Sequence, residues 1–543
     1  MTQVQSVTIR PARRAGGLRR LAAGLVRLFT SARTAPAAVL WFATAHAVLW
    51  TLILVAQKAA QDVHMDVAEA FGWGQQFLLG YGKHPPLSGW LAGVWFWAFP
   101  VRDWSAYALA MAILGVSLVV CWLIARRVVD ARRAAVTVLL LAIYPIFNFK
   151  GFKYNADLLQ LVTLPLIVLA YLHAFEKRSA VSGFWLGLAA VAGMMTKYWA
   201  VTVIGAVGIA ALAHPARLAF LRSPAPWVAV AVFLAGMAPH LVWLVRVDFA
   251  PLVYAGDVYE LPSRLAGAEF ALHYLGHNIA LLLVPLAALA VALRWRPLRH
   301  VLRDTPLDMM RHAVLWRPAA GSVDVSQARN VWTIQAALAV LPPLGAAALG
   351  IYIKTDWGIP LFFLVPLAVL AVPFLGVQRI VLVRLAAIWL ALTLVALAGS
   401  PWLAEMSVKP EPEVGSMANP TSQFAPRLTE AWHQRFHSRW AVVAGTTEVG
   451  ALMTFYSPDH PVTFTPGEVW SSGLTSLAEA KRRGFIGICD TTDSRLPECE
   501  RWMAQNAANA ERLDVSARRF FHGEAGPQMV WKVYLVPPAV AAR

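Results

Sequence analysis

Long apolar runs dominate the chain between Ala37 and Ser400, and short polar loops separate them. A helix of about 20 apolar residues is long enough to cross the hydrocarbon core of a bilayer. Backbone groups at that depth need partners within the protein, which favours helices. The pattern predicts an all-α polytopic membrane domain with about eleven transmembrane helices. We place them near residues 36–57, 104–125, 134–149, 157–174, 181–196, 199–213, 227–246, 272–293, 331–352, 358–377 and 381–399.

Composition and charge agree with this prediction. Of 543 residues, 58% are hydrophobic and only 14% are charged, which is unusual for a soluble protein. The net charge of +17 raises the alternative of nucleic-acid binding. However, the arginines concentrate in the first 34 residues and in every second loop, as the positive-inside rule requires of cytoplasmic segments. We therefore expect membrane lipids, and no nucleic acid, as partners of the basic segments.

The same rule sets the expected topology. Residues 1–34 contain no acidic residue and form a predicted cytoplasmic basic tail. No cleavage site follows the first apolar run, so we interpret that run as a retained span and not as a signal peptide. The predicted cytoplasmic loops contain Arg126, Arg127, Arg132 and Arg133; Lys177 and Arg178; Arg217 and Arg222; Arg294, Arg296, Arg299, Arg303, Arg311, Arg317 and Arg329; and Arg379 and Arg384.

The chain becomes polar after Ser400. Residues 401–543 are predicted to form a small α/β extracytoplasmic (periplasmic) domain, behind a membrane domain that spans residues 35–400. Its expected elements are strands at 440–444, 485–489 and 530–536 and a helix at 474–483. Cys489 and Cys499 both fall in this domain, so we predict a disulfide between them, with two unrelated thiols as the alternative. Cys121 lies in a span and is interpreted as packing.

The opposite loops, on the predicted extracytoplasmic face, mix acids, lysines and aromatic residues. The first of them is the most informative. A helix over residues 65–80 places Asp66 and Glu69 on one face and apolar residues on the other. Two neighbouring carboxylates raise each other's pKa, which makes them candidates for a general base. The alternative is the solvated polar face of a helix on the membrane surface.

A stiff turn follows this predicted helix. Residues before a proline are held extended, so the sequence Lys83-His84-Pro85-Pro86 presents its two basic side chains in fixed positions. A lysine is a suitable point charge for a phosphate. The alternative is an ordinary proline turn with Lys83 directed towards lipid headgroups.

These residues carry a resemblance. Asp66-x-x-Glu69 followed by Gly80-Tyr-Gly-Lys-His-Pro-Pro-Leu87 resembles the first extracytoplasmic loop of bacterial C-type (GT-C) glycosyltransferases. The resemblance is to the superfamily of protein O-mannosyltransferases, aminoarabinose transferases and lipopolysaccharide galacturonosyltransferases. Three later stretches within residues 40–375 are also similar: Lys153-Tyr-Asn-Ala-Asp157, Thr196-Lys197-Tyr198 and Lys354-Thr-Asp-Trp357-Gly-Ile-Pro360.

The resemblance implies a membrane enzyme that transfers a sugar from a polyprenyl-phosphate donor to an acceptor at the outer face of the bacterial inner membrane. The acceptor stays open among lipid A or other lipopolysaccharide, a glycolipid, a polysaccharide and a protein. The resemblance places the base at Asp66, an acceptor-orienting acid at Asp157 and the donor-phosphate lysine at Lys83. In mannosyltransferases the two first-loop acids are typically adjacent, whereas here they are three residues apart, so the choice between Asp66 and Glu69 stays open.

Basic side chains on the same face are candidates for stabilising the phosphate leaving group. Attack opposite that group inverts the anomeric carbon. No nucleotide-binding motif is present, which suits a lipid-linked donor. The predicted substrate-binding residues are Tyr81, Lys83, His84, Lys153, Asn155, Lys197, Tyr198, Arg246, Arg264, Lys354 and Trp357. Several of them are equally consistent with anchoring at the membrane interface.

No cofactor is expected. A divalent ion bound by Asp66, Glu69 and Asp157 is the alternative, which we disfavour because lysine and arginine can neutralise the phosphate. A secondary transporter or lipid flippase is the main alternative function, but transporters place ionisable residues near the middle of the membrane. A non-catalytic accessory or sensor protein is a third, and it has no need of the clustered first-loop acids and lysine.

Overall fold

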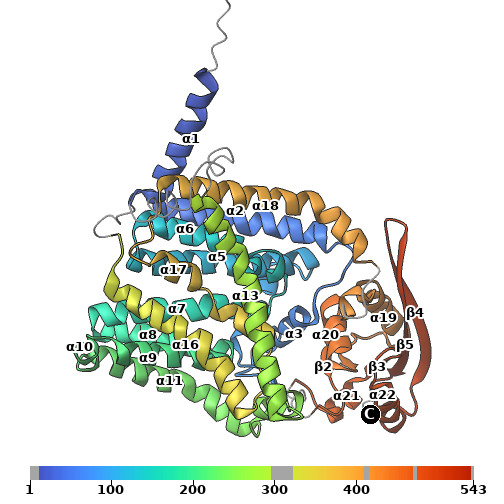
Figure 1. The fold of residues 1–543 in the computed structure, drawn as a ribbon. Coiled ribbons are helices and arrows are strands. Elements are labelled where there is room, and N and C mark those ends of the chain that lie inside the picture. The colour runs from blue at the N-terminus through green and yellow to red at the C-terminus, as the bar shows by residue number, and fades with distance from the viewer. Residues whose placement is uncertain (1–11, 295–321, 409–414, 469–473, 540–543) are drawn as a thin grey trace, which may run out of the picture.

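The computed structural model describes residues 12–294, 322–408, 415–468 and 474–539. A bundle of helices occupies most of the molecule, and a small domain built on one sheet lies at one end of it (Figure 1). The predicted fold class, a helical membrane domain with a C-terminal α/β domain, is confirmed. The predicted boundaries at residues 34 and 400 stay predictions. A helix α1 (Ala12–Thr30) lies within the tail, and α18 runs through residue 400 to Met406.

Seven helices in the described residues are long and apolar enough to cross a membrane, and a bent pair adds an eighth. The bent pair joins α6 (Ala131–Ile143) to the short helices η1 (Pro145–Phe147) and η2 (Phe149–Phe152) at 78°. Two shorter apolar helices are α8 (Ala180–Thr196) and α9 (Val201–Ala213), the latter preceded by η3 (Tyr198–Ala200). The seven are α2 (Ala35–Gln57), α5 (Asp103–Val128), α7 (Ala156–Lys177), α11 (Pro224–Arg246), α13 (Arg264–Arg294), α16 (Val325–Leu349) and α18 (Arg379–Met406).

One predicted span is divided into shorter pieces. Residues 358–377 do not form a single helix but lie partly in η4 (Thr355–Leu361) and α17 (Val365–Leu370). Prolines at 360, 366 and 373 interrupt the run, and proline in a helix interior removes a hydrogen bond and clashes with the preceding turn. The structure thus contains fewer long apolar helices than the eleven predicted spans. Two short connecting helices complete this part, α10 (Arg217–Leu221) and α12 (Ala250–Val258).

The predicted first-loop helix is shorter than expected, because α3 runs from Met65 to Gly74. Phe77 has a φ of 47°, a left-handed conformation that no helix continues. A further apolar helix, α4 (Leu87–Ala98), follows and crosses α3 closely. A Cβ atom on Gly74 would lie 2.4 Å from the backbone nitrogen of Gly93, so the crossing requires glycine.

The C-terminal sheet has five strands in the order β2-β1-β3-β5-β4. Strand β1 (Val442–Ala444) pairs in parallel with β2 (Val462–Phe464) and β3 (Phe485–Asp490). Strands β4 (Glu511–Phe521) and β5 (Glu524–Val536) form an antiparallel hairpin. The predicted strands and the helix α21 (Leu477–Arg483) are present, and the Cys489–Cys499 disulfide is confirmed. The other elements are η5 (Gly415–Ala418), α19 (Thr421–Phe436), α20 (Thr447–Tyr456) and α22 (Leu496–Asn506).

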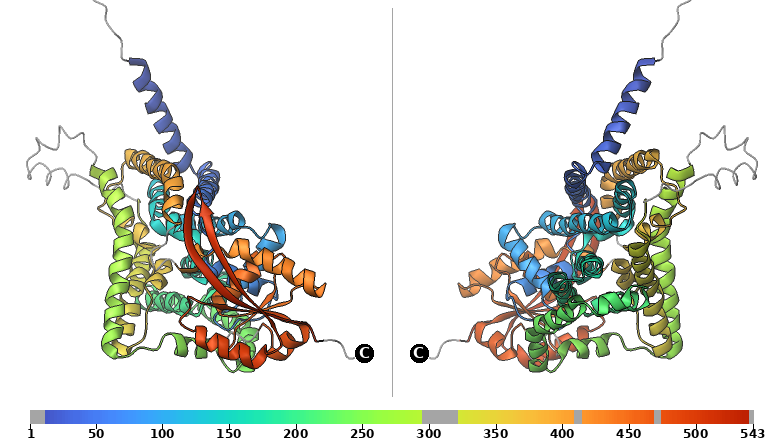
Figure 2. Two further views of the ribbon diagram at one scale, coloured as in Figure 1. Left: turned by 90° about the vertical axis from the view of Figure 1, so that its right-hand side faces the viewer. Right: turned by 90° about the vertical axis from the view of Figure 1, so that its left-hand side faces the viewer.

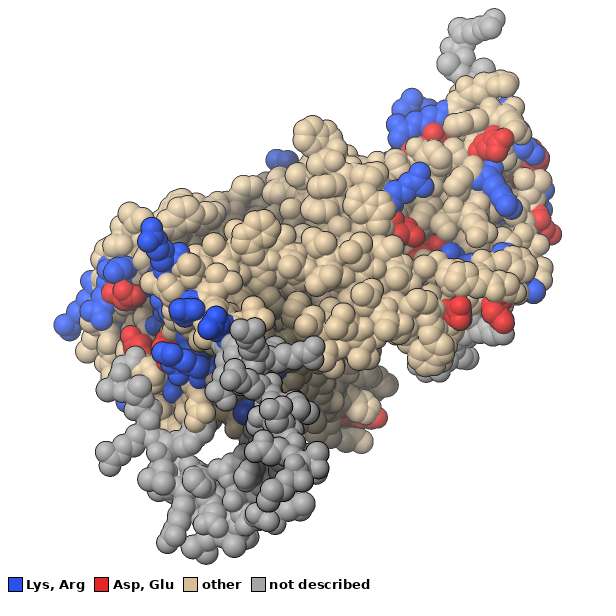
Figure 3. Space-filling model, turned by 90° about the horizontal axis from the view of Figure 1, so that it is seen from above, with Lys and Arg blue, Asp and Glu red and all other residues tan. Residues whose placement is uncertain are grey.

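The hairpin β4–β5 extends well beyond the rest of the sheet, and its tip points towards the end of α18 (Figures 1 and 2). At its tip, His522 Nδ1 lies 3.0 Å from Glu405 Oε1 near the end of α18. Figure 3 shows the distribution of charge along the molecule. Lysine and arginine gather at one end, a broad uncharged band covers the middle, and both signs mix over the C-terminal domain. This is the surface of a multi-pass membrane protein.

Candidate active site

Helix α3 carries both first-loop acids. It begins after His64, whose Nδ1 accepts a hydrogen bond from the Asp66 backbone nitrogen at 3.1 Å. The apolar face is buried as predicted, with Val67 and Ala70 each 1% exposed. This face is covered by protein, and the predicted position of the helix on the membrane surface stays a prediction. The Phe71 ring packs between Phe96 of α4 and Phe455 of α20, so α3 is enclosed between the bundle and the C-terminal domain.

Asp66 is held by the start of α7. Asn155 Nδ2 donates to Asp66 Oδ2 at 2.8 Å, while Asn155 Oδ1 caps the helix by accepting from the Leu158 nitrogen at 2.9 Å. Lys153 Nζ lies 3.7 Å from the same carboxylate. Burial opposes ionisation of Asp66, but the charges of His64 and Lys153 and the Asn155 hydrogen bond outweigh it and lower its pKa. Asp66 is therefore a carboxylate at neutral pH, and the raised pKa expected of both first-loop acids is wrong for Asp66.

A cavity of about 200 Å³ opens beside Asp66. The lysines that line it come from three segments: the bend after α6, the turn before α7, and the start of η4. Its charged lining residues are Asp66, Lys150, Lys153, Asp157, Lys354 and Asp356. We call it the charged cavity.

Asp157 is paired across this region. Lys197 Nζ, on the loop after α8, lies 2.6 Å from Asp157 Oδ1. Lys197 is only 8% exposed, and its ammonium lies 5.0 Å from the centroid of the Trp357 ring. Lys197 therefore brings together three of the stretches that carry the family resemblance: 153–157, 196–198 and 354–360.

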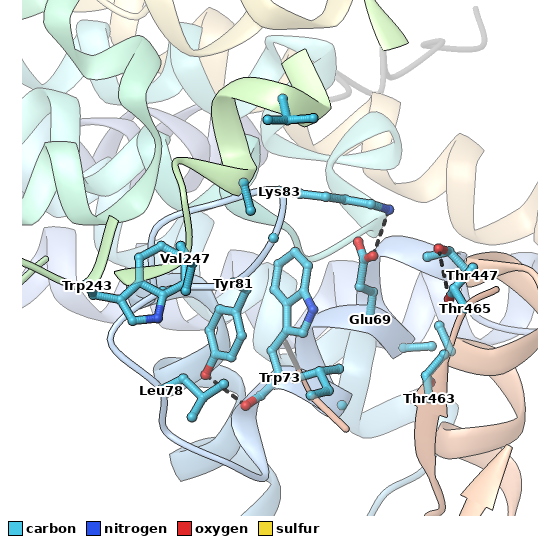
Figure 4. A pocket seen from close by; sticks show the side chains of 18 of the residues that line it. Glu69, Trp73, Leu78, Tyr81, Lys83, Trp243, Val247, Thr447, Thr463 and Thr465 are labelled. Carbon is cyan, nitrogen blue, oxygen red and sulfur yellow. Dashed lines mark hydrogen bonds and ion pairs between the residues drawn. The ribbon is translucent and has the colours of Figure 1, made fainter. Parts of the chain in front are cut away.

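Glu69 faces a second cavity, of about 420 Å³ (Figure 4). Lys83 Nζ lies 2.7 Å from Glu69 Oε1, and the two side chains are 10% and 12% exposed. Burial raises the pKa of Glu69, and the charge of Lys83 only partly offsets this. Trp73, Tyr81 and Trp243 supply much of the surrounding apolar surface. We call it the aromatic cavity.

The far wall of the aromatic cavity belongs to the C-terminal domain. It includes Thr447 at the start of α20, Thr463 in β2 and Thr465 just after it (Figure 4). Sequence reasoning missed these residues, which lie nearly 400 positions from Glu69. No local pattern marks a threonine of the C-terminal domain as part of a cavity that it shares with the helical bundle.

Of three other predicted site residues, Tyr81 lines the aromatic cavity, whereas His84 and Tyr198 line neither cavity. Tyr81 stacks on Trp73 and donates to its carbonyl at 2.7 Å. Burial and, to a smaller extent, the charge of Lys197 lower the pKa of His84 to about 3, so His84 is neutral. The Tyr198 hydroxyl lies 2.9 Å from His240 Nε2.

Two predicted cations are not brought to the site. Arg246 ends α11 and Arg264 begins α13, and both are exposed and line neither cavity. In contrast, Asp356 was missed as a site residue although it stands within the Lys354–Trp357 stretch. Its carboxylate lies 4.0 Å from Lys153 and 3.9 Å from His277.

The described residues contain no group of three or more His, Cys, Asp or Glu side chains arranged to hold a metal ion. The alternative ligand set of Asp66, Glu69 and Asp157 is thus not gathered into one such group. That the reaction uses no cofactor or metal stays a prediction.

Comparisons with known proteins agree with the resemblance noted in the sequence. The model of a family described as dolichyl-phosphate-mannose-protein mannosyltransferase matches residues 83–243. Lipid A galacturonosyltransferase RgtD of Rhizobium johnstonii is 24% identical over 219 residues, which cover 39% of this chain and 44% of RgtD. The matched part thus spans less than half the length of that relative.

Two solved structures of ArnT from Cupriavidus metallidurans are also similar. The one bound to undecaprenyl phosphate has a TM-score of 0.49 at 13% identity, covering 92% of this chain and 98% of ArnT. The apo structure has a TM-score of 0.46 at 12% identity, covering 95% and 98%. The resemblance to the C-type glycosyltransferase superfamily is confirmed. The family match includes Lys83, Asp157 and Lys197 and ends before Lys354.

Proposed function

We propose that this protein is an inverting glycosyltransferase that moves a sugar from a polyprenyl-phosphate donor to an envelope acceptor. One observation carries the proposal. Carboxylates and lysines from several separate loops converge on α3, where a charged cavity and an aromatic cavity open on Asp66 and Glu69. A secondary transporter or flippase is less well supported, because transporters place their ionisable residues near the middle of the membrane, whereas Glu69 and Lys83 share a cavity with residues of the C-terminal domain.

In the proposed reaction, a hydroxyl of the acceptor attacks the anomeric carbon. A new C–O bond forms there as the bond to the donor phosphate oxygen breaks, and the configuration inverts. Asp66 accepts the hydroxyl proton, with Asn155 and Lys153 fixing its orientation. Lys83 stabilises the charge of the departing polyprenyl phosphate. Asp157 and Lys197 orient the acceptor.

The two cavities suggest which substrate each one accepts. The aromatic cavity combines apolar surface with Lys83 and suits a prenyl-linked sugar phosphate. The charged cavity, with three lysines, suits a polar acceptor headgroup. The partial likeness to a lipid A galacturonosyltransferase supports an acceptor of the lipopolysaccharide class. The positive-inside rule supports a cytoplasmic N-terminus and a periplasmic C-terminal domain in the bacterial inner membrane.

Envelope lipids provide the direct test. We expect a strain that lacks this protein to lose one envelope lipid species and to accumulate a precursor lighter by one glycosyl residue, as measured by mass spectrometry. The purified protein in nanodiscs should convert that precursor when polyprenyl-phosphate sugar is supplied. A transporter would instead change the distribution of a lipid across the membrane without changing its mass, and that result would contradict the proposal.

The pH dependence of the transfer activity should reflect the protonation of Glu69. Its pKa is raised, so activity that needs its carboxylate is lost as the pH falls through that raised value, whereas Asp66, with a lowered pKa, stays ionised over the same range. We expect Glu69→Gln to lower the maximal rate and to shift the acid limb of the kcat/KM profile to lower pH. If Glu69→Gln has the same acid limb as the wild type, the acid limb reflects the titration of another group.

A further inference from the structure

The segment that leads into α3 lies against the C-terminal region. Asp62 is fully buried. Its carboxylate accepts hydrogen bonds from the backbone nitrogen and hydroxyl of Ser422, at 2.9 and 2.7 Å, and forms an ion pair with Arg519. The backbone nitrogen of Asp62 donates to the Met417 carbonyl at 2.8 Å. Three separate stretches of the C-terminal region therefore contact one residue of the first loop.

Arg519 is itself firmly placed. It lies on β4, is 8% exposed, and also donates to the Asn419 carbonyl at 3.0 Å. Removing one partner of a buried ion pair leaves the other charge uncompensated, which is more costly than losing an exposed pair. The contact between Arg519 and Asp62 is thus a strong constraint on where the loop lies.

The next residue is held by a second contact. The Val63 backbone nitrogen donates to the Tyr456 hydroxyl at 2.7 Å, and that hydroxyl donates to Asp103 Oδ1 at 2.9 Å. Tyr456 ends α20 and Asp103 begins α5. One tyrosine therefore joins the loop to both the C-terminal domain and the membrane bundle.

These contacts lie immediately before the candidate catalytic residues. Asp62 precedes Asp66 by four residues, in the non-helical segment that ends at His64, the residue that caps α3. Farther along α3, the Phe71 ring lies 5.0 Å from the ring of His460, also in the C-terminal domain. The position of α3, and with it the direction of Asp66 and Glu69, depends on contacts made by the C-terminal region.

We propose that Arg519 and Asp62 are positioning residues: through them the C-terminal domain holds α3 so that Asp66 and Glu69 face their cavities. The effect on catalysis rests on the proposed function, whereas the effect on α3 does not. A displacement of about 1 Å at reacting groups can lower a rate by about 100-fold. The ion pair therefore acts on turnover although it touches no substrate.

The test uses the full-length protein in nanodiscs and three variants. We expect Arg519→Gln to lower kcat by about 10- to 100-fold while KM changes much less. Arg519→Lys keeps a positive charge beside Asp62 and should recover part of the loss. The control Glu511→Gln removes an exposed ion pair with Arg435 in the same domain and should leave both constants unchanged.

Hydrogen exchange separates positioning from general folding. In Arg519→Gln we expect the amides of α3 to exchange at least about tenfold faster, while those of β3 exchange as in the wild type. Unchanged exchange in α3 would overturn the proposal, as would an equal loss of protection in β3, which would indicate a role in folding alone. If the wild-type protein transfers no sugar, the proposed function fails, and the exchange of α3 still decides whether Arg519 positions it.

Discussion

Replacing Asp66 by asparagine is expected to lower kcat for glycosyl transfer by about 100- to 10,000-fold, the range typical of a lost general base. The variant keeps the size of the side chain and its place on α3. It removes the proton acceptor and leaves an amide opposite the Asn155 amide, which now donates to Asp66 Oδ2. The measurement is single-turnover transfer from a polyprenyl-phosphate sugar in nanodiscs.

A matched control is available on β4. Asp514 is exposed on the sheet, so Asp514→Asn should transfer sugar at the wild-type rate. Near-wild-type turnover by Asp66→Asn would move the base to Glu69. In that case Glu69→Gln, and not Asp66→Asn, should show the large loss of kcat, which decides between the two acids.

Lys83→Ala is expected to weaken donor binding and to lower kcat/KM by about 100- to 1000-fold, comparable to the loss of one stabilising group at a developing charge. The ammonium now lies 2.7 Å from Glu69 in a cavity where both side chains are about nine-tenths buried. A phosphate placed there gains more from the charge than it would in water. Titration with polyprenyl phosphate measures the donor affinity directly.

Loss of Lys83 also leaves the buried Glu69 carboxylate without its ammonium partner. An uncompensated buried charge can destabilise the fold by itself. The double variant Lys83→Ala with Glu69→Gln removes that uncompensated charge. If donor binding is still weakened in the double variant, the weakening is due to the lost contact between Lys83 and the phosphate. Lys83→Arg should keep much of the affinity, and Lys481→Ala, on the exposed face of α21, should keep all of it. Wild-type donor affinity in Lys83→Ala would remove Lys83 from the phosphate site.

Local sequence was sufficient for features whose cause is local. Helical spacing placed Val67 and Ala70 on the buried face of α3, and the apolar runs located most of the long helices. It failed where several prolines interrupt an apolar run, because hydropathy does not register the loss of helical hydrogen bonds at 358–377. It also overextended α3, which ends at Gly74, before the left-handed conformation of Phe77.

The site was predictable in part for the same reason. The sequence selected Asp66, Glu69, Asp157, Lys83 and Lys197 as candidates because they are charged residues beside apolar runs, where charge is costly. It also selected Arg246 and Arg264 on that ground, and the fold directs both away from the cavities. Contacts such as Arg519 with Asp62, or Thr463 with the aromatic cavity, depend on how two parts of the chain dock. The local sequence around each of these residues does not indicate which other part of the chain it contacts.

The threonine wall of the aromatic cavity has a consequence for how such a protein can diversify. The acids and lysines that line the two cavities come from residues 66–157, from Asp248 and from residues 354–356, whereas the threonines of the wall come from residues 447–465. Substitutions that reshape the wall therefore need not alter any group placed in proton transfer. If the protein is the proposed glycosyltransferase, changes confined to its C-terminal domain can alter the substrate while the reaction chemistry stays the same.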